Sequence, residues 1–359
     1  MIRVLIVDDS AVLRQTTRFI LTSDANITVI GEATNGADAV AMAERMRPDV
    51  ITMDIRMPKM DGPQAIRQIM AASPVPIIVV TGVDLAHELD LSTQLSKLGA
   101  VSILQRPEVV SAPDFKVFTS KLIEQVKLMS TVKVVRRVRT EAAALSDTGS
   151  KLPMPVLKTP VKTEIVAIGS STGGPAALHK LLGGIPADFP VPIVVVQHIS
   201  FGFVQGLADW LNDACQLSVK VAQAGEKIHS GTVYLAPDNN HMLVDRLNRI
   251  MLNPSEPIGG HRPAVTALFQ SVAQSYGPAA MAVILTGMGA DGAVGMRALY
   301  EAGAVTIAQD EASCVVFGMP KEAIALGAVQ QIVPLDRIAQ TLTGLIAMQG
   351  ASLEKEKSL

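Results

Sequence analysis

Three residues of the C-terminal half have side chains of the types that could together perform acyl-transfer chemistry. Ser171 lies in the small-residue turn 170–175, which follows an apolar run and precedes a helical pattern. His198 directly follows another apolar run, and Asp291 lies in the glycine-rich segment 287–292. A serine hydroxyl is a poor nucleophile until a base takes its proton, and that imidazole must be oriented and its charge offset. The residue types predict Ser171 as nucleophile, His198 as base and Asp291 as the supporting acid.

The serine turn alone is a weak signal. Glycine-rich turns between a strand and a helix also cradle phosphates, and the sequence GSSTGG matches neither the P-loop, nor the dinucleotide fingerprint, nor G-x-S-x-G. The chain order Ser, His, Asp differs from the Ser, Asp, His order of α/β-hydrolases, which favours a separate fold family with convergent geometry. The hydrolase hypothesis therefore depends on the three residues lying together.

The N-terminal part carries a second group of reactive side chains. Asp8 and Asp9 follow the first predicted strand, Asp54 the third, Thr81 ends the fourth, and Arg106 follows the fifth. The carboxyl ends of parallel strands share one edge of a sheet, so these residues converge there. Clustered carboxylates repel one another unless a cation intervenes, and oxygen ligands suit Mg²⁺. We expect Asp54 to accept a phosphoryl group, the three aspartates to hold Mg²⁺, and Thr81 and Arg106 to contact the phosphoryl oxygens.

Two sets of short apolar strands, each alternating with helical patterns, must position these groups. Such alternation predicts a parallel, doubly wound α/β sheet in each half. In the second half, residues 234–252 look like closely spaced strands around Asp238-Asn239-Asn240, which predicts a hairpin interrupting the parallel order. The expected strands cover 4–7, 28–30, 50–53, 77–80, 101–104, 165–168, 193–196, 233–235, 281–285, 305–308 and a segment near Ile332.

The length of 359 residues favours two domains. Residues 129–160 are rich in Lys, Arg, Ser, Thr and Pro without periodicity, which is typical of a linker. We therefore predict a first domain over 1–128, a catalytic domain over 161–350 and a polar tail over 351–359.

Composition excludes several classes of protein. Hydrophobic residues make up 48% and charged residues 18% of the chain, and the net charge of −2 gives no electrostatic footprint for nucleic acid. The N-terminus reaches two aspartates before an apolar leader forms, and no apolar run approaches the length of a bilayer span. We expect a cytoplasmic protein that neither binds nucleic acid nor inserts into a membrane.

Both halves resemble known families. The acids, threonine and basic residue at the strand ends of the first half are similar to those of response-regulator receiver domains. The segments GSSTGG, Gln197-His198, GHRPAV from 260, LTGMGADG from 285 and AQDEASCVVFGMPKEA from 308 resemble the chemotaxis protein-glutamate methylesterase family over essentially the whole chain. The resemblance implies hydrolysis of glutamyl methyl esters on chemoreceptors, with release of methanol, and deamidation of receptor glutamines.

The resemblance also implies roles for particular residues. It selects Ser171 rather than Ser170 as the nucleophile and places an oxyanion site at the backbone N–H of Met288. It implies Mg²⁺ in the receiver domain, no cofactor for the esterase, a histidine kinase as phosphodonor, and inhibition by the unphosphorylated receiver. The chain departs from the family at Arg106, where lysine is usual, and at 199–202, where Met-Pro and small residues usually follow the histidine.

Other interpretations stay open at this point. His261-Arg262-Pro263 could line the cleft, although Pro263 also suits the first turn of a helix. A binding module whose glycine turns hold a nucleotide is the alternative to an enzyme, and the triad discriminates between them. A DNA-binding output is weaker, because no helix-turn-helix with a basic recognition helix follows the first domain.

Overall fold

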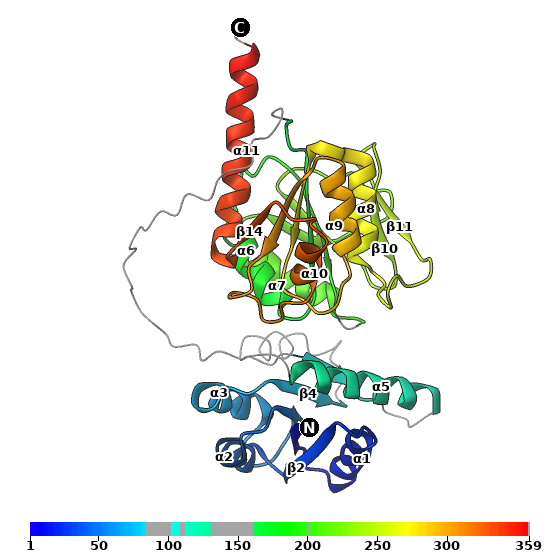
Figure 1. Cartoon of the computed structure of the whole chain (residues 1–359), viewed down its shortest axis with the longest axis vertical. Helices are drawn as coiled ribbons and strands as arrows, with labels where there is room; N and C mark the ends of the chain where they lie inside the picture. Colours follow the sequence, from blue (N-terminus) through cyan, green and yellow to red (C-terminus); the bar gives the residue numbers. More distant parts are fainter. Residues whose placement is uncertain (83–101, 108–111, 131–160, 200, 358–359) are drawn as a thin grey trace. The chain divides into compact units, whose positions relative to one another are not determined.

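The structure is a computed structural model, and it describes residues 1–82, 102–107, 112–130, 161–199 and 201–357. The chain divides into two compact units, Met1–Leu145 and Ser146–Leu359 (Figure 1). This division falls inside the segment predicted as the linker. Residues 131–160 of that linker lie outside the described residues.

The N-terminal unit is a five-stranded parallel sheet in the order β2-β1-β3-β4-β5. The central strands β3 and β4 are fully buried and β1 is mostly buried, as expected where helices cover both faces of a sheet, whereas the edge strand β2 is mostly half-buried. The elements are β1 (Ile2–Val7), α1 (Ala11–Thr22), β2 (Ile27–Ala33), α2 (Gly36–Met46), β3 (Val50–Met53), α3 (Gly62–Ala72), β4 (Ile77–Thr81), β5 (Ser102–Gln105) and α5 (Ala112–Met129).

The strand order reverses between β1 and β3, and ligands of doubly wound sheets bind at such a switch point. Side chains cap the helices that leave this edge: Ser10 accepts from the N–H of Leu13 in α1, and Asp61 from the N–H of Gln64 in α3. The N–H of Asp54 donates to the carbonyl of Val7 at 2.8 Å, so the ends of β1 and β3 lie next to each other.

The C-terminal unit contains a seven-stranded parallel sheet in the order β14-β13-β12-β6-β7-β9-β8. Its order reverses between β6 and β12, which defines a second switch point. The strands are β6 (Ile165–Ser170), β7 (Ile193–Gln197), β8 (Ser218–Val221), β9 (Thr232–Leu235), β12 (Ala280–Ile284), β13 (Val305–Gln309) and β14 (Gln331–Val333).

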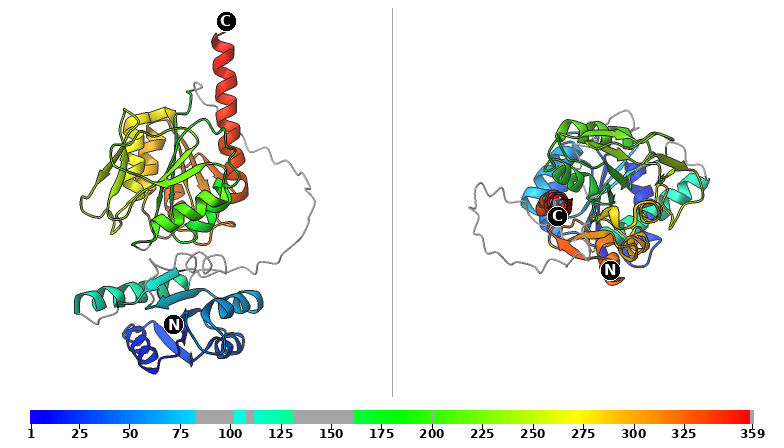
Figure 2. Two further views of the ribbon diagram at one scale, coloured as in Figure 1. Left: turned by 180° about the vertical axis from the view of Figure 1, so that it is seen from behind. Right: turned by 90° about the horizontal axis from the view of Figure 1, so that it is seen from above.

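Helices cover both faces of this second sheet, which makes its core two-sided (Figures 1 and 2). One face packs against α6, α7 and α11, through residues such as Leu178, Leu211 and Leu342. The other packs against α8, α9 and α10, through residues such as Phe269 and Met296. The helices are α6 (Gly174–Leu182), α7 (Val204–Ala214), α8 (Val265–Tyr276), the 3-10 turn η1 (Gly277–Ala279), α9 (Ala293–Glu301), α10 (Met319–Ala325) and α11 (Leu335–Lys357).

The predicted hairpin exists, but its turn and its place in the fold were wrong. Strands β10 (His241–Val244) and β11 (Ile250–Asn253) pair antiparallel in a sheet of their own, beside α8, and leave the main sheet parallel (Figure 1). The turn lies at 245–249, where the Asp245 carboxylate accepts from the N–H groups of Leu247 and Arg249. Asp238-Asn239-Asn240 instead connects β9 to the hairpin, because Tyr234 belongs to the main sheet.

The other strands predicted from periodicity are present. Strand β8 was missed, since Ser218–Val221 is short and only partly buried at the sheet edge. Helix α11 runs to Lys357 and so includes most of the segment predicted as a polar tail. Within the described residues, every helix is too short or too polar to cross a membrane.

Candidate active site

The strand ends at the second switch point bring the serine turn and the histidine together. Ser170 pairs with Gln197 across β6 and β7, and the N–H of His198 donates to the carbonyl of Ser170 at 2.9 Å. From the opposite side, the N–H of Ser171 donates to the carbonyl of Thr286 at 3.1 Å. Ser171 is therefore held between the ends of β7 and β12.

His198 and Asp291 form a direct hydrogen bond, with 2.8 Å between Nε2 and Oδ2. A carboxylate only accepts, so Nε2 carries the proton. The other ring nitrogen, Nδ1, is buried and has no hydrogen-bond partner among the residues that the structure describes. His198 thus presents an unprotonated nitrogen on the side of the ring away from Asp291.

Asp291 also caps helix α8, whose own N-cap residue Ala264 supplies no side-chain bond. The N–H groups of Val265 and Thr266 donate to its two carboxylate oxygens at 2.7 and 2.9 Å. Burial alone raises the pKa of Asp291, but the bond and charge of His198 and the bonds from Thr266 outweigh it and lower that pKa to about 2. The carboxylate is therefore charged at neutral pH.

The buried amide of Gln197 connects the serine turn to His198 through hydrogen bonds. Its Nε2 donates to the carbonyls of Ser171 and His198 at 2.8 and 2.7 Å, and its Oε1 accepts from the Ser170 hydroxyl at 2.6 Å. An amide is the one side chain that offers two donors and an acceptor in this arrangement. Sequence reasoning treated Gln197 only as part of a resemblance and missed this role.

The segment after β12 completes the surroundings of Ser171. Gly287 approaches so closely that a Cβ there would lie 2.8 Å from the Cβ of Ser171, which explains the glycine. The next N–H, that of Met288, has no hydrogen-bond partner within the described part of the chain. The Thr286 hydroxyl donates to the carbonyl of Thr172 at 2.9 Å and fixes this segment to the serine turn.

His261 lies against His198. Its ring stacks on that of His198 with 3.9 Å between centroids and 3° between planes. Burial and the charge of His198 lower the pKa of His261, and Asp291 opposes them. Pro263 lies outside α8, before the N-cap residue Ala264, so the interpretation of Pro263 as a first-turn residue is wrong.

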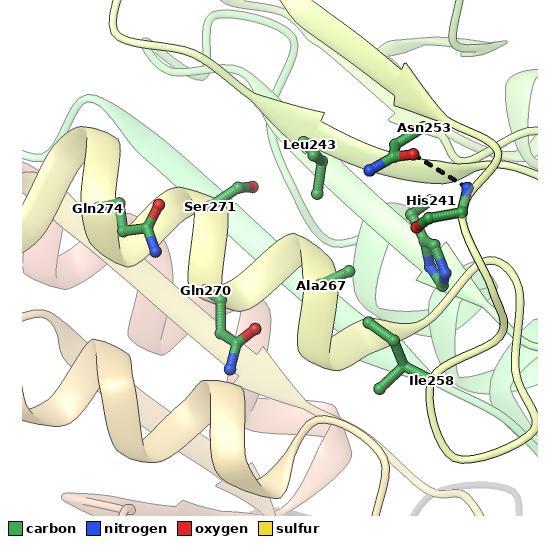
Figure 3. A pocket seen from close by; sticks show the side chains of 9 residues that line it. His241, Leu243, Asn253, Ile258, Ala267, Gln270, Ser271 and Gln274 are labelled. Carbon is green, nitrogen blue, oxygen red and sulfur yellow. Dashed lines mark hydrogen bonds between the residues drawn. The ribbon is translucent and has the colours of Figure 1, made fainter.

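His241 holds the segment around His261 through hydrogen bonds to Glu256 and Ala264. It is buried, its Nδ1 accepts from the N–H of Ala264 at 3.1 Å, and its Nε2 donates to the carbonyl of Glu256 at 3.1 Å. His241 also lines a pocket of about 220 Å³ between α8 and the β10–β11 hairpin (Figure 3). The pocket wall is otherwise mostly amide and hydroxyl groups, and it includes none of the proposed catalytic residues.

The first switch point gathers the predicted acids. Asp8, Asp9 and Asp54 each place a carboxylate oxygen within 4.8 Å of the others. Burial, together with the charge of Asp8, raises the pKa of Asp54 to about 6, and burial is also the main cause of the raised pKa of Asp8. A cluster of oxygen ligands that repel one another fits a divalent cation such as Mg²⁺.

Thr81 and Arg106 stand at the same edge, at the ends of β4 and β5. The N–H of Arg106 donates to the carbonyl of Thr81 at 2.8 Å. The guanidinium of Arg106 lies 3.4 Å from Oδ2 of Asp8 and passes close to Gly82. Of the three aspartates, the structure thus pairs Arg106 directly with Asp8.

The two folds and their strand-end sites define a response regulator with an enzymatic output domain. Residues 4–112 match the family model of the response regulator receiver domain, and residues 166–342 match that of CheB methylesterase. The C-terminal domain is similar to the catalytic domain of the Thermotoga maritima CheB methylesterase, with 40% identity and a TM-score of 0.50, over 52% of this chain and 100% of that one.

Full-length relatives give the family. A protein-glutamate methylesterase/protein-glutamine glutaminase of Nitrosospira multiformis is 45% identical over 98% of both chains. One of Myxococcus xanthus is 44% identical over 97% of this chain and 98% of its own. The chain belongs to the protein-glutamate methylesterase/protein-glutamine glutaminase family.

The lowered pKa of Asp291 predicts a specific dependence of stability on pH. A folded-state pKa of about 2 means that its charged form stabilises the fold above the unfolded value of 3.8, and that this stability is lost as pH falls toward 2. The contribution is about 2 kcal/mol at about pH 5 and about half of that at about pH 3. The difference in unfolding free energy between wild type and Asp291→Asn should shrink accordingly.

Urea unfolding followed by fluorescence measures this difference, because the single tryptophan, Trp210, reports on the C-terminal domain alone. The matched control is Asp188→Asn, at an exposed aspartate of the same domain. A difference for Asp291→Asn that stays constant over this pH range would contradict the prediction.

Proposed function

We propose that the C-terminal domain hydrolyses glutamyl methyl esters of chemoreceptors, and deamidates their glutamines, with Ser171, His198 and Asp291 as the catalytic residues. The observation that carries the proposal is the bond from His198 Nε2 to the Asp291 carboxylate, 2.8 Å long, on a histidine whose backbone is bonded to Ser170. A module that only bound a nucleotide would need no such pair beside a serine. No observation favours that alternative.

In the first half of the reaction, the Ser171 hydroxyl attacks the ester carbonyl carbon and passes its proton to Nδ1 of His198. The imidazolium that forms is balanced by the buried charge of Asp291. The carbonyl oxygen becomes an oxyanion, which we assign to the N–H of Met288. When the tetrahedral intermediate collapses, the carbon–oxygen bond to the methoxy group breaks and His198 returns the proton, so that methanol leaves.

In the second half, water takes the place of the serine. His198 accepts its proton, the hydroxide attacks the acyl carbon, and the bond to Ser171 breaks as the serine regains a proton from His198. The product is a glutamate side chain. A glutamine substrate follows the same path with ammonia as the leaving group, and no cofactor is required by either reaction.

We propose that phosphorylation of Asp54 controls this chemistry. Asp8, Asp9 and Asp54 would hold Mg²⁺, which offsets the charge of the incoming phosphoryl group, and Thr81 and Arg106 would contact its oxygens. A histidine kinase would be the phosphodonor. The unphosphorylated receiver would inhibit the esterase, and a cytoplasmic location belongs to the same proposal.

Replacing the nucleophile or the base should abolish hydrolysis. Ser171→Ala and His198→Ala should each lower kcat by about 10⁴-fold or more, because these two groups act as a unit, and Asp291→Ala should cost less. Methanol release from methyl-labelled receptor measures the rate. The matched controls are Ser230→Ala and His229→Ala, at exposed positions of the same domain. Full activity in pure Ser171→Ala protein would reject the nucleophile.

Replacing the amide that joins the two catalytic segments should also slow the reaction. Gln197→Glu keeps the shape but removes both donors, so a carboxylate would face the carbonyls of Ser171 and His198. A displacement of about 1 Å costs about 100-fold, and we expect kcat to fall by that order while KM changes little. Gln223→Glu, at an exposed site, is the control. Unchanged kcat in a folded Gln197→Glu protein would remove the positioning role.

Phosphorylation should activate the full chain. A small-molecule phosphodonor with Mg²⁺ should raise the rate of methanol release by about 5- to 150-fold, the usual range of coupling between two sites, and Asp54→Ala should not respond. The phosphodonor without Mg²⁺ is the control. The fragment from about Val161 onward should be active without phosphodonor. A folded fragment no faster than the unphosphorylated chain would exclude inhibition by the receiver.

A further inference from the structure

We propose that His261 is a positioning residue for the reaction, whose ring must stay uncharged while it holds the ring of His198 in place. The proposal rests on the function proposed above and goes beyond it, because the hydrolysis mechanism needs only one histidine. Its basis is the parallel stack of the two imidazoles, with 3.9 Å between their centroids.

The chain presents His261 on a rigid turn. The N–H and C=O groups of Ile258 and His261 bond to each other reciprocally at 3.1 and 3.0 Å. The two residues between them, Gly259 and Gly260, have φ values of 59° and 85°, the region required at both central positions of a type I′ turn. The turn therefore fixes the backbone of His261 independently of its side chain.

The residues that follow His261 are fixed as well. Arg262 turns its guanidinium away, donating to the carbonyls of Pro254 and Ser255 at 3.0 and 3.1 Å. The N–H of Ala264 donates to the buried His241. The short segment that carries His261 is thus held at both ends, and its ring is a fixed surface rather than a side chain in solvent.

The ring of His261 restrains a rotation of the His198 ring that the hydrogen bond to Asp291 does not prevent. One hydrogen bond at Nε2 holds that end of the ring but still allows some rotation of the ring about its Cβ–Cγ bond. A flat ring against its face opposes the rotation and keeps Nδ1 directed to one side. Small errors of orientation at a base are costly, because proton transfer requires alignment with the nucleophile.

Charge decides which state of His261 is compatible with turnover. Among the residues that the structure describes, the ionisable groups that act on the charge of its ring are His198 and Asp291, and the Arg262 guanidinium donates to backbone carbonyls instead. His198 becomes positive when it takes the proton of the nucleophile, and a second cation at this separation would oppose that step. Burial and the neighbouring His198 lower the pKa of His261, which keeps its ring neutral at neutral pH.

Three substitutions in the full chain separate shape from charge. His261→Phe keeps a flat uncharged ring, His261→Arg keeps a flat group with a permanent charge, and His261→Ala removes the surface. Profiles of kcat and KM against pH for methanol release should show Phe within about threefold of wild type. The Ala variant should lose about 10- to 100-fold in kcat with KM nearly unchanged.

The Arg variant tests the charge of residue 261 through the pH profile, which a purely structural role would not shift. Its permanent charge opposes protonation of His198, so the acid limb of the profile should shift to lower pH by about one unit or more, with a lower maximal rate. His229→Phe and His229→Arg, at an exposed histidine, should leave the profile unchanged. An unshifted acid limb in a folded Arg variant, or wild-type kcat in the Ala variant, would overturn the proposal.

A second measurement distinguishes failure of this inference from failure of the proposed function. In proteins with ¹³C-labelled histidine, NMR titration should show the pKa of His261 rising in His198→Phe, because one of the causes that lower it is removed. This result does not depend on catalysis. Activity in Ser171→Ala would reject the esterase mechanism, whereas an unchanged His261 titration in His198→Phe would reject the coupling of the two rings.

Discussion

The hydrogen bonds accepted by the Asp291 carboxylate are the interactions on which the geometry around His198 depends. The carboxylate accepts from Nε2 of His198 and from the first N–H groups of α8, so one buried charge joins the loop after β12, the end of β7 and the start of a helix. A helix N-terminus stabilises a negative charge within its first turn. The N–H of Gly292 returns a bond to the Thr266 hydroxyl at 2.8 Å, which closes the connection from both sides. The charge that orients the His198 ring thus also caps the N-terminus of α8.

Strand periodicity was sufficient to predict both doubly wound sheets and the edges at which the reactive side chains meet. That prediction holds because the carboxyl ends of parallel strands share an edge, so a residue after an apolar run has its location set by topology. His261 and Gln197 could not be found in the same way. His261 follows a turn rather than a main-sheet strand, and the role of Gln197 depends on three hydrogen bonds, two of which reach Ser170 and Ser171 on the neighbouring segment. The hairpin was misplaced for a related reason, since polar residues mark any turn equally well.

The switch points of the two sheets shift the pKa of their aspartates in opposite directions. Asp54 follows β3 and Asp291 follows β12, each at the strand that borders the reversal of its sheet. Burial acts to raise the pKa of both carboxyl groups. The net pKa of Asp54 is raised to about 6, whereas that of Asp291 is nevertheless lowered to about 2. The difference lies in the neighbours: Asp54 faces other carboxylates, whereas Asp291 faces a histidine and a helix N-terminus. The first surroundings favour a bound cation, and the second keep the carboxylate charged.

Arg106 shows that the position of a charge at the strand ends does not by itself determine its partner. Its strand places it beside the acids, as the sequence predicted, but its guanidinium lies against Asp8 and reaches past Gly82. A planar fork engages oxygen pairs in fixed directions, whereas an ammonium is a compact point charge. To contact a phosphoryl group on Asp54, Arg106 would have to leave Asp8. Its planar guanidinium would then have to reorient as a whole, whereas a point charge would only have to move. Topology fixes which residues meet at this edge, and the shape of the side chain determines which partner each one holds.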